Sequence, residues 1–430
     1  MPTTHDVASA RRSEPTALKA SRGRPGVVTA GLTLTYLAAA TIPWTAVDVG
    51  SISVGEILLA FAAVTLVAAD LSRPLPTPPP WVWALAVAVL VVGTIHQFAP
   101  PSAAYMARRE GLSGSTVILD TNLVVTLHLV IRVLFTAFVF ALARSHDRRA
   151  LNRSSVAFLG GVSICAVIAF TDSRGWTSIS SSLLGVGVSD GRGSGLTEHP
   201  NVVAMTCVIA LPLMLWLLLG SRRARVLALA GLGCLLLGLY ASRSRSGAGA
   251  AAIAAFVSFV WMPQYRRYLP TTGLLATLVL GVLFVTNPDL GSELLSGLRI
   301  TGGDTSGSDR SRNIVNDQAM RDFLHSPIHG IGFEIADIAH FLYLQALAVG
   351  GVILLTGLIV YQAGALIRSA RLTRVEQLAV PLFVAVLGEV IFNTLQNALT
   401  PTIAYLAPAL VAALPSDGLR QADFAPVRAG

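Results

Sequence analysis

Residues 287–339 read NPDLGSELLSGLRITGGDTSGSDRSRNIVNDQAMRDFLHSPIHGIGFEIADIA and separate two strongly apolar runs. This polar stretch carries Arg310, Arg312 and Arg321, and His340 follows it directly at the start of the next apolar run. Ionisable residues are costly in or near a lipid bilayer, and where a membrane protein gathers them they usually serve a function. The pattern therefore predicts a long loop outside the bilayer, between two membrane spans, that carries functional groups.

The remainder of the chain is apolar enough to make this a membrane protein. Hydrophobic residues make up 53% of the sequence and charged residues only 13%. Apolar runs near the spanning length of about 20 residues recur throughout, which predicts an all-α polytopic membrane protein with about twelve transmembrane helices. The expected spans lie near residues 27–45, 52–70, 81–98, 122–143, 155–171, 200–219, 226–240, 247–262, 270–286, 340–361, 379–395 and 402–414.

The predicted domain organisation is simple. Residues 1–26 form a disordered cytoplasmic tail, residues 27–416 form one transmembrane domain that includes the extracytoplasmic loop 288–339, and residues 417–430 form a second cytoplasmic tail. We expect the first span to be retained, because no convincing cleavage site follows the basic tail. The three cysteines all fall inside predicted spans, so they indicate neither a disulfide framework nor a metal cluster.

The basic residues predict the orientation of the chain, because short cytoplasmic loops retain Lys and Arg. An N-terminus on the inside places 20 of the 31 Lys and Arg residues on the cytoplasmic side. We therefore predict N-in and C-in topology in the cytoplasmic membrane, with an even number of spans. The net charge of +8 is explained by attraction to anionic membrane lipids, and no nucleic acid partner is expected.

Two short motifs then fall on the predicted outer side. The first is His199-Pro200-Asn201, where a Gly- and Ser-rich loop delivers a histidine to the start of a span. Pro200 suits the first turn of a helix, since its missing N–H is harmless there. His199 either contributes to a site at the outer face or only caps the helix, and the sequence leaves both interpretations open.

The second motif is the turn Ser242-Arg243-Ser244-Arg245-Ser246-Gly247 between two apolar helices. Guanidinium groups are permanently charged and bind phosphate oxygens in bidentate fashion, and the helix that follows offers N–H groups to the same anion. An anion site is therefore one interpretation, and snorkelling of the arginines toward lipid headgroups is the other. Two arginines on the outer side run against the positive-inside trend, which favours the anion site.

The long loop itself predicts an amphipathic helix over Asn313–Leu324 that lies on the outer surface. Its apolar residues are expected to anchor it against the bundle or the acyl boundary, while Arg310 and Arg312 point into a polar cleft. Ser326-Pro327 ends this helix. His340 then opens the next span near Tyr343 at the outer mouth.

These segments together resemble the bacterial O-antigen ligase and O-antigen polymerase family of lipid-linked-glycan-dependent membrane glycosyltransferases. The family shows a His-Pro-Asn at a span start, a Ser-Arg-Ser-Gly-like turn, an arginine before a short amphipathic helix with a Pro-x-x-Gly-x-Gly return, and a histidine near Tyr-Leu-Gln. The matching positions are His199-Pro200-Asn201, Ser244–Gly247, Arg312, Pro327–Gly332, His340 and Tyr343-Leu344-Gln345. The chain departs from the family at Asn316, where tryptophan is frequent, and at Phe341, where asparagine is common.

The resemblance implies a GT-C-like membrane enzyme that moves a glycan from a polyprenyl diphosphate carrier to an acceptor hydroxyl, with inversion and on the outer face. Arg245 and Arg312 would stabilise the leaving diphosphate, and His340 would be the general base. Arg243, Arg310, His199, Asn201 and Tyr343 would bind substrate. No cofactor and no metal is expected, because the sequence has no Asp-x-Asp pair, no His-Glu-x-x-His and no Cys cluster.

Several alternatives remain open from the residues. His340 could instead hydrogen-bond a neighbouring loop. Glu56, Arg132 and Glu389 lie inside predicted spans, and a pairing that fixes helix packing is as reasonable as a place in a lipid-carrier groove.

The class of function also has rivals. A glycan or glycolipid acceptor distinguishes a ligase from a polymerase of the same family, and a partner flippase would supply the donor. A polytopic transporter or flippase is the rival outside the enzyme class, but transporters commonly have two related halves, and the long outer loop has no counterpart in the first half.

Overall fold

The computed structural model describes residues 25–49, 52–72, 74–109, 121–186, 191–266, 306–334, 339–396 and 399–415. Within these ranges helices dominate, and the sheet is limited to the short antiparallel pair β1 (Asp48–Val49) and β2 (Ile52–Ser53). The all-α polytopic architecture predicted from the sequence is confirmed.

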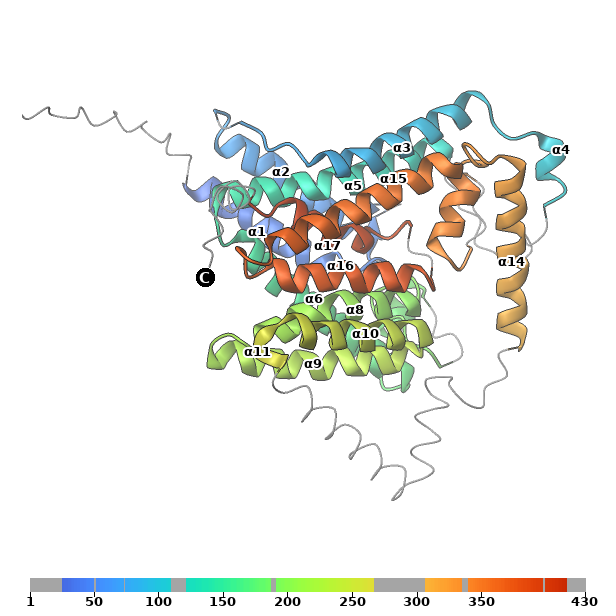
Figure 1. Cartoon of the computed structure of the whole chain (residues 1–430). Helices are drawn as coiled ribbons and strands as arrows, with labels where there is room; N and C mark the ends of the chain where they lie inside the picture. Colours follow the sequence, from blue (N-terminus) through green and yellow to red (C-terminus); the bar gives the residue numbers. More distant parts are fainter. Residues whose placement is uncertain are drawn as a thin grey trace, which may run out of the picture.

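The long bundle helices run side by side in Figure 1, and shorter elements connect them. The helices are α1 (Pro25–Thr41), α2 (Val54–Ala69), α3 (Pro80–Phe98), α4 (Ala103–Met106), α5 (Asn122–His146), α6 (Ala150–Ser173), α7 (Ile179–Leu184), α8 (Pro200–Leu217), α9 (Arg222–Ser242), α10 (Arg245–Trp261), α11 (Pro263–Arg266), α14 (Ser306–His325), α15 (Leu342–Leu372), α16 (Ala379–Asn393) and α17 (Leu406–Ala412), with a 3₁₀ helix η1 (Thr402–Tyr405).

Six described helices, α3, α5, α6, α8, α9 and α15, are long and apolar enough to cross a membrane. Helices α1, α2, α10 and α16 coincide with further predicted spans but are shorter, and the predicted span 270–286 lies outside the described residues. The prediction for 402–414 was wrong in kind: η1 and α17 together cover 402–412, and all of these residues are buried. At about 1.5 Å per residue this segment is too short to cross the hydrocarbon core, and it packs inside the bundle instead.

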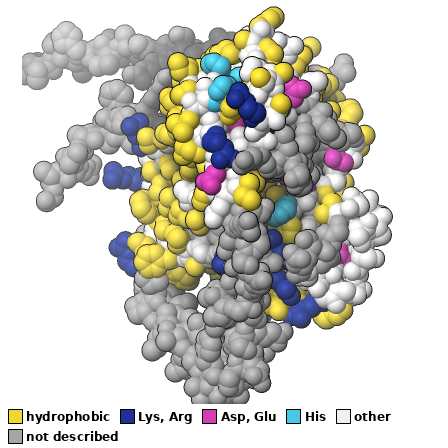
Figure 2. Space-filling view, turned by 90° about the vertical axis from the view of Figure 1, so that its right-hand side faces the viewer, with side chains coloured by type: hydrophobic (Ala, Val, Ile, Leu, Met, Phe, Trp, Pro, Cys, Tyr) yellow, Lys and Arg dark blue, Asp and Glu magenta, His cyan; other side chains and the backbone are white. Residues whose placement is uncertain are grey.

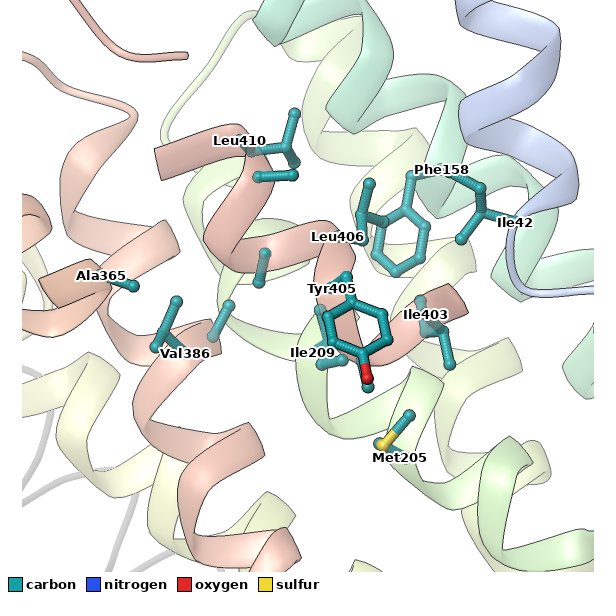
Figure 3. Packing of buried hydrophobic residues seen from close by; sticks show 14 of the residues in the cluster. Ile42, Phe158, Met205, Ile209, Ala365, Val386, Ile403, Tyr405, Leu406 and Leu410 are labelled. Atoms are coloured by element: carbon teal, nitrogen blue, oxygen red, sulfur yellow. The ribbon is translucent and has the colours of Figure 1, made fainter. Parts of the chain in front are cut away.

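The centre of the core is α8, most of whose residues are buried. It contacts α6, α9, α10 and α16, so lipid has little access to it. Figure 3 shows Met205 and Ile209 of α8 close to Tyr405 of η1, with Phe158 and Leu406 nearby. This packing places the first residues of α8 among the ends of several other helices.

Two of the three charged residues predicted inside spans form a partly buried ion pair. Arg132 Nε of α5 donates to Glu56 Oε1 of α2 at 2.5 Å, and Thr402 Oγ1 of η1 donates to the same oxygen at 2.7 Å. The hypothesis that Arg132 pairs with a carboxylate to fix helix packing is confirmed for Glu56. Glu389 lies elsewhere, buried on α16 beside Tyr361 and Asn393.

Helix α14 lies across the ends of the bundle helices instead of running parallel to them (Figure 1). It spans Ser306–His325, so it begins earlier than the predicted Asn313, and Arg312 lies within it. Its buried residues are Gln318, Ala319 and Asp322, whereas the apolar Ile314, Met320 and Leu324 are exposed. The predicted apolar face is therefore divided. Ala319 packs against the bundle, whereas the other three apolar side chains do not, so for these three the acyl boundary stays the prediction.

The polar anchor of α14 is Asp322. Its carboxylate accepts Arg109 Nε at 3.0 Å and Arg109 Nη2 at 2.6 Å. The Tyr105 hydroxyl of α4 donates to Oδ1 at 2.7 Å, and Gln318 Nε2 donates to it at 2.9 Å. Both charged side chains are almost completely buried. A bidentate pair in a dry site has a specific geometry, so it fixes the position of α14 relative to the α4 segment.

The turn after α14 is held by a break in α15. Gly351 has φ of 58° and ψ of −156°, which interrupts the helix. The freed N–H and C=O groups bond to the turn: Val352 N donates to Pro327 O at 2.9 Å and Ile331 N donates to Ala348 O at 2.9 Å. A Cβ on Gly330 would lie 2.3 Å from the Val349 carbonyl carbon, so only glycine fits there. The predicted Pro-x-x-Gly-x-Gly turn is thus hydrogen-bonded to the first part of α15.

Candidate active site

A cavity of about 420 Å³ lies at the end of the bundle that α14 crosses. Its walls come from the α9–α10 turn, the start of α8, the middle of α14, and the segments just before α15 and just after α16. The lining residues are Arg192, Asn201, Arg243, Ser244, Arg245, Ser246, Arg312, Asn313, Asn316, His340, Phe341, Leu395 and Gln396. Four of them are arginines, and no Asp or Glu is found among these described lining residues. Figure 2 looks onto this end, where basic and histidine side chains lie among apolar ones.

The α9–α10 turn presents two of the arginines. Arg243 ends α9 in the left-handed conformation, with φ of 46°, and it is the one non-glycine residue with positive φ in the described ranges. Ser244 caps α10, since its hydroxyl accepts from Gly247 N at 3.2 Å. Arg245 is therefore the first residue of a helix, where the backbone N–H groups and the helix dipole also favour an anion.

The start of α8 contributes a cap and an amide. His199 Nδ1 accepts from Asn201 N at 3.1 Å, so the histidine caps the helix as one of the two interpretations expected. The Asn201 side chain lines the cavity. Arg192, in the loop before α8, donates from Nη2 to Asn201 Oδ1 at 2.6 Å and from Nε to Ser242 O at 2.9 Å.

His340 lies between α14 and the helix ends. Its backbone N donates to Asn316 Oδ1 of α14 at 3.1 Å. Burial lowers the pKa of the His340 imidazole, the positive charge of Arg312 lowers it further, and a hydrogen bond with the Gln396 side chain acts in the opposite direction. The net lowering keeps His340 neutral near pH 7, the form in which a ring nitrogen can accept a proton.

His199 titrates still lower. Loss of hydration lowers its pKa to about 4, and the charges of Arg192, His340 and Arg312 act in the same direction. His199 is nevertheless exposed at the surface, so contact with solvent reduces this lowering of its pKa. His199 is neutral at physiological pH, which agrees with Nδ1 acting as an acceptor.

The structure brings most of the predicted site residues together. His340, Arg312, Arg245, Arg243 and Asn201 line one cavity. His199 lies beside it as a cap. Tyr343 does not line it, because its hydroxyl donates to Gln362 Oε1 at 2.8 Å within α15. Arg310 belongs to α14, but its side chain lies outside the described part of the structure.

Sequence reasoning did not place Arg192 and Gln396 in the site, although both line the cavity. Arg192 lies in the Gly- and Ser-rich loop on the predicted outer side. A basic residue on that side runs against the positive-inside trend, and this could have marked it as a site residue. Gln396 comes three residues after the end of α16 and has no charge or motif to distinguish it. Only the packing of α16 against α8 shows that it reaches the cavity.

No group of three or more His, Cys, Asp or Glu side chains in the described ranges is arranged to hold a metal ion. Among the aspartates of the loop 288–339, Asp317 is exposed on α14, whereas Asp304 and the Asp309 side chain lie outside the described residues.

The fold and the cavity define a polytopic helical membrane protein with a strongly cationic site at one end of its bundle. Residues 230–359 match the family model described as O-antigen ligase. This segment is therefore similar to the O-antigen ligase family, and the resemblance seen in the sequence is confirmed over these residues. No curated protein matches the chain. The matched segment contains Arg243, Arg245, Arg312 and His340, whereas Arg192, Asn201 and Gln396 lie outside it.

Proposed function

We propose that this protein transfers a glycan from a polyprenyl diphosphate carrier to an acceptor hydroxyl at the outer face of the cytoplasmic membrane. The observation that carries the proposal is the cavity itself, which joins four arginines to one histidine of lowered pKa. An excess of fixed positive charge suits a diphosphate, and a neutral imidazole suits an acceptor that must lose a proton.

The donor end of the reaction needs cations that are in place before the bond breaks. Arg245 at the start of α10 and Arg312 on α14 approach the cavity from two different elements. Guanidinium groups bind phosphate oxygens in bidentate fashion, and they stabilise the negative charge that develops on the leaving diphosphate. Arg243 and Arg310 would make secondary contacts to phosphate or sugar.

The acceptor end uses His340. As the acceptor oxygen attacks the anomeric carbon, the bond from that carbon to the diphosphate oxygen breaks, and the hydroxyl proton moves to a ring nitrogen of His340. The diphosphate leaves with the electron pair on the carrier, so charge and atoms balance without a covalent enzyme intermediate. A single direct displacement inverts the anomeric configuration.

The position of α14 supports a lipid-linked donor. Its exposed apolar side chains, Ile314, Met320 and Leu324, lie on the helix that also carries Arg312. A helix of this kind at the acyl boundary would let a polyprenyl chain remain in lipid while its diphosphate reaches the arginines. The acceptor is a glycan or glycolipid. If the acceptor is a growing chain of the same glycan, the reaction is a polymerisation. A flippase would deliver the donor to the outer face.

The test is release of polyprenyl diphosphate from a glycan-loaded carrier by the purified protein in lipid vesicles. We expect release that depends on acceptor and that is lost in His340→Ala and Arg312→Ala, with normal membrane insertion. Arg222→Ala is the matched control, because Arg222 begins α9 at the end opposite Ser242 and the cavity. Movement of carrier or solute across the bilayer with no bond broken would contradict the enzyme proposal and would indicate a transporter.

A further inference from the structure

A second, very small cavity lies inside the bundle, where α15, α16 and η1 meet. Its volume is about 10 Å³, and it is lined by Leu342, Leu358, Tyr361, Gln362, Glu389, Asn393, Leu399, Ala404 and Tyr405. Three of the polar side chains in this lining are almost completely buried, since Glu389 is 2% exposed, Tyr361 2% and Asn393 1%. The proposed transfer reaction uses none of these three, so a carboxyl group among them in an apolar interior needs its own explanation.

Two other polar groups in the lining already have partners. The hydroxyl of Tyr405, whose ring Figure 3 shows within the packed core, donates to Leu399 O. Gln362 Oε1 accepts from the Tyr343 hydroxyl at 2.8 Å. These two groups therefore do not serve the buried atoms of Glu389 and its neighbours.

Four buried atoms of the lining have no hydrogen-bond partner among the described residues. They are the Tyr361 hydroxyl, Glu389 Oε2, and both Nδ2 and Oδ1 of Asn393. Buried polar groups are almost always hydrogen-bonded, because a donor or acceptor without a partner costs free energy. Four such atoms around one cavity therefore indicate a polar ligand inside it.

No positive charge compensates Glu389 among the described residues that line the cavity, where the other titratable groups are tyrosine hydroxyls. Of the elements packed on α16, α8 and α17 contain no charged residue, and Arg245 of α10 lines the first cavity. The arginines of α15 lie in its last two turns, where Arg368 donates to backbone carbonyls at the end of α17. Arg132 of α5 is already in an ion pair. An ionised carboxylate without a counter-ion is very costly in such an interior, which favours a carboxyl group that keeps its proton.

The four atoms suit a water molecule better than a metal cation. Asn393 Nδ2 can only donate and Oδ1 can only accept, whereas the Tyr361 hydroxyl and a protonated Glu389 carboxyl group can do either. Water has two hydrogens and two lone pairs, so it can bond to a set of this kind, and the cavity is about the smallest that holds one water molecule. A cation would meet the Asn393 N–H groups and only three unpartnered oxygens among the described atoms, fewer than the roughly six that hard cations prefer.

We propose that Glu389 is a neutral carboxylic acid and that this cavity is a binding site for one water molecule, which joins α15 to α16 through Tyr361, Glu389 and Asn393. Glu389 and Asn393 are four residues apart on α16 and therefore share one face of that helix. Tyr361 reaches the same cavity from α15. The water replaces the direct hydrogen bonds that these three side chains do not make with one another. This site does not depend on the proposed function.

Infrared spectroscopy of the purified protein in lipid vesicles tests the charge of Glu389 without any substrate. A carboxylic acid has a C=O stretching band that shifts in D₂O, and an ionised carboxylate lacks this band. We expect the band in wild type at neutral pH and its loss in Glu389→Gln. It should remain in the control Glu376→Gln, which makes the same change at a partly exposed carboxylate just before α16. If no such band depends on Glu389, its carboxylate is ionised and the proposal is overturned.

Thermal unfolding in detergent tests the shared hydrogen bonds. Glu389→Gln keeps a neutral side chain of similar shape that both donates and accepts, so its unfolding midpoint should stay close to that of wild type. Glu389→Leu leaves the groups of Asn393 and Tyr361 with fewer partners, and its midpoint should fall by several degrees. Asn393→Leu should act in the same direction, and the double variant should lose less than the sum of the two, because both changes break one arrangement. Losses that simply add would contradict a shared water molecule.

Two further measurements use wild type alone. The unfolding midpoint should be the same in sodium, potassium and choline chloride at one ionic strength, and a rise specific to sodium or potassium would assign the cavity to a cation instead. An experimental structure that resolves ordered water should show one peak within hydrogen-bond distance of the Tyr361 hydroxyl, Glu389 Oε2 and the Asn393 amide. The absence of that peak, or a peak whose oxygen neighbours lie at the shorter distances of a cation, overturns the proposal. Transfer activity enters none of these outcomes, so a failure of the proposed function would leave them unchanged.

Discussion

At the scale of single residues, Arg243 combines an uncommon backbone conformation with a position in the cavity wall. Its φ of 46° and ψ of 36° place it in the left-handed region, where an L side chain costs roughly 1–2 kcal/mol. Strain of this kind is often found at functional sites. The geometry directs the guanidinium group toward Gly191, whose added Cβ would lie 3.3 Å from Arg243 Nη1.

Two substitutions separate the strain from the charge. Arg243→Gly should raise the free energy of unfolding by about 1 kcal/mol, because glycine adopts positive φ without cost, whereas Arg243→Ala keeps the strain. Both remove the guanidinium group, so both should raise the KM for the donor to a similar degree. Thermal unfolding in detergent together with donor titration gives the answer, and equal stability of the two variants would contradict the account.

In the proposed mechanism, His340 sets the pH dependence of the reaction. Its pKa is lowered by burial and by Arg312, and the base must be neutral to act, so kcat/KM should stay high as pH falls through about 6.5 and decline only below it. Arg312→Gln removes the nearby charge and should move the limb of the residual activity to higher pH, whereas Arg321→Gln should not. A midpoint near pH 4 would instead assign the limb to His199.

At the scale of elements, the position of α14 depends on a contact far from the cavity. Asp322 and Arg109 are buried together near the C-terminal end of the helix, while Arg312 and Asn316 face the cavity from its middle. The Tyr105 hydroxyl donates to the same carboxylate, and burial and that carboxylate both raise the Tyr105 pKa. Within this anchor Asp322 and Arg109 are paired and Tyr105 is uncharged. Because the anchor fixes one end of α14, it also determines where Arg312 lies on the same helix.

Loss of one partner should consequently affect both stability and catalysis. Asp322→Asn leaves a buried guanidinium group without its counter-ion, which costs about 3–5 kcal/mol, and transfer should fall although no cavity residue has changed. The double variant Asp322→Leu with Arg109→Met should recover part of the stability. Asp317→Asn on the exposed side of α14 is the control. Wild-type kcat in Asp322→Asn would show that the anchor does not position the site.

The observed helices also show which elements could be predicted from the sequence. The spans that correspond to α3, α5, α6 and α8 were predicted within a few residues, because long apolar runs leave few alternatives in lipid. The break at Gly351 was not predicted, since a glycine in an apolar run also fits an unbroken span. The break forms because the turn at Pro327–Gly332 supplies partners for the backbone groups it frees.

At the scale of the whole molecule, one partly buried polar network connects distant parts of the chain. Glu56 of α2 accepts from Arg132 of α5 and from Thr402 of η1, and Arg132 Nη1 also donates to Thr400 O at 2.5 Å. Glu56 additionally forms the capping box at the start of α2 with Ser53. Helix α2 near the start of the chain and η1 near its end are thereby joined inside the bundle.

Neutralisation of this network should lower stability throughout the bundle. Glu56→Gln keeps a side chain suited to the capping box but leaves Arg132 without its anion, and we expect a loss of about 3 kcal/mol in the free energy of unfolding. The control is Asp147→Asn, which removes an ion pair with the exposed Arg153 and should leave the unfolding midpoint unchanged. Equal midpoints for Glu56→Gln and wild type would contradict this role.

The sequence by itself determined the membrane class, most of the spans and five of the residues that line the cavity. Apolar runs report the cost of exposing backbone and polar groups to lipid, and charged residues outside those runs stand out against them. Such signals are local, so they can be read one segment at a time.

Only the tertiary structure decided that the helix ends carrying His340, Arg312, Arg245 and Asn201 meet in one cavity with Arg192 and Gln396. It likewise decided that Tyr343 bonds within α15, that α14 turns polar residues inward, and that η1 and α17 are buried. The physical reason is that these outcomes depend on contacts between segments up to hundreds of residues apart. Polar side chains in different loops compete to make those contacts. A local sequence pattern does not tell which of them will form the contact.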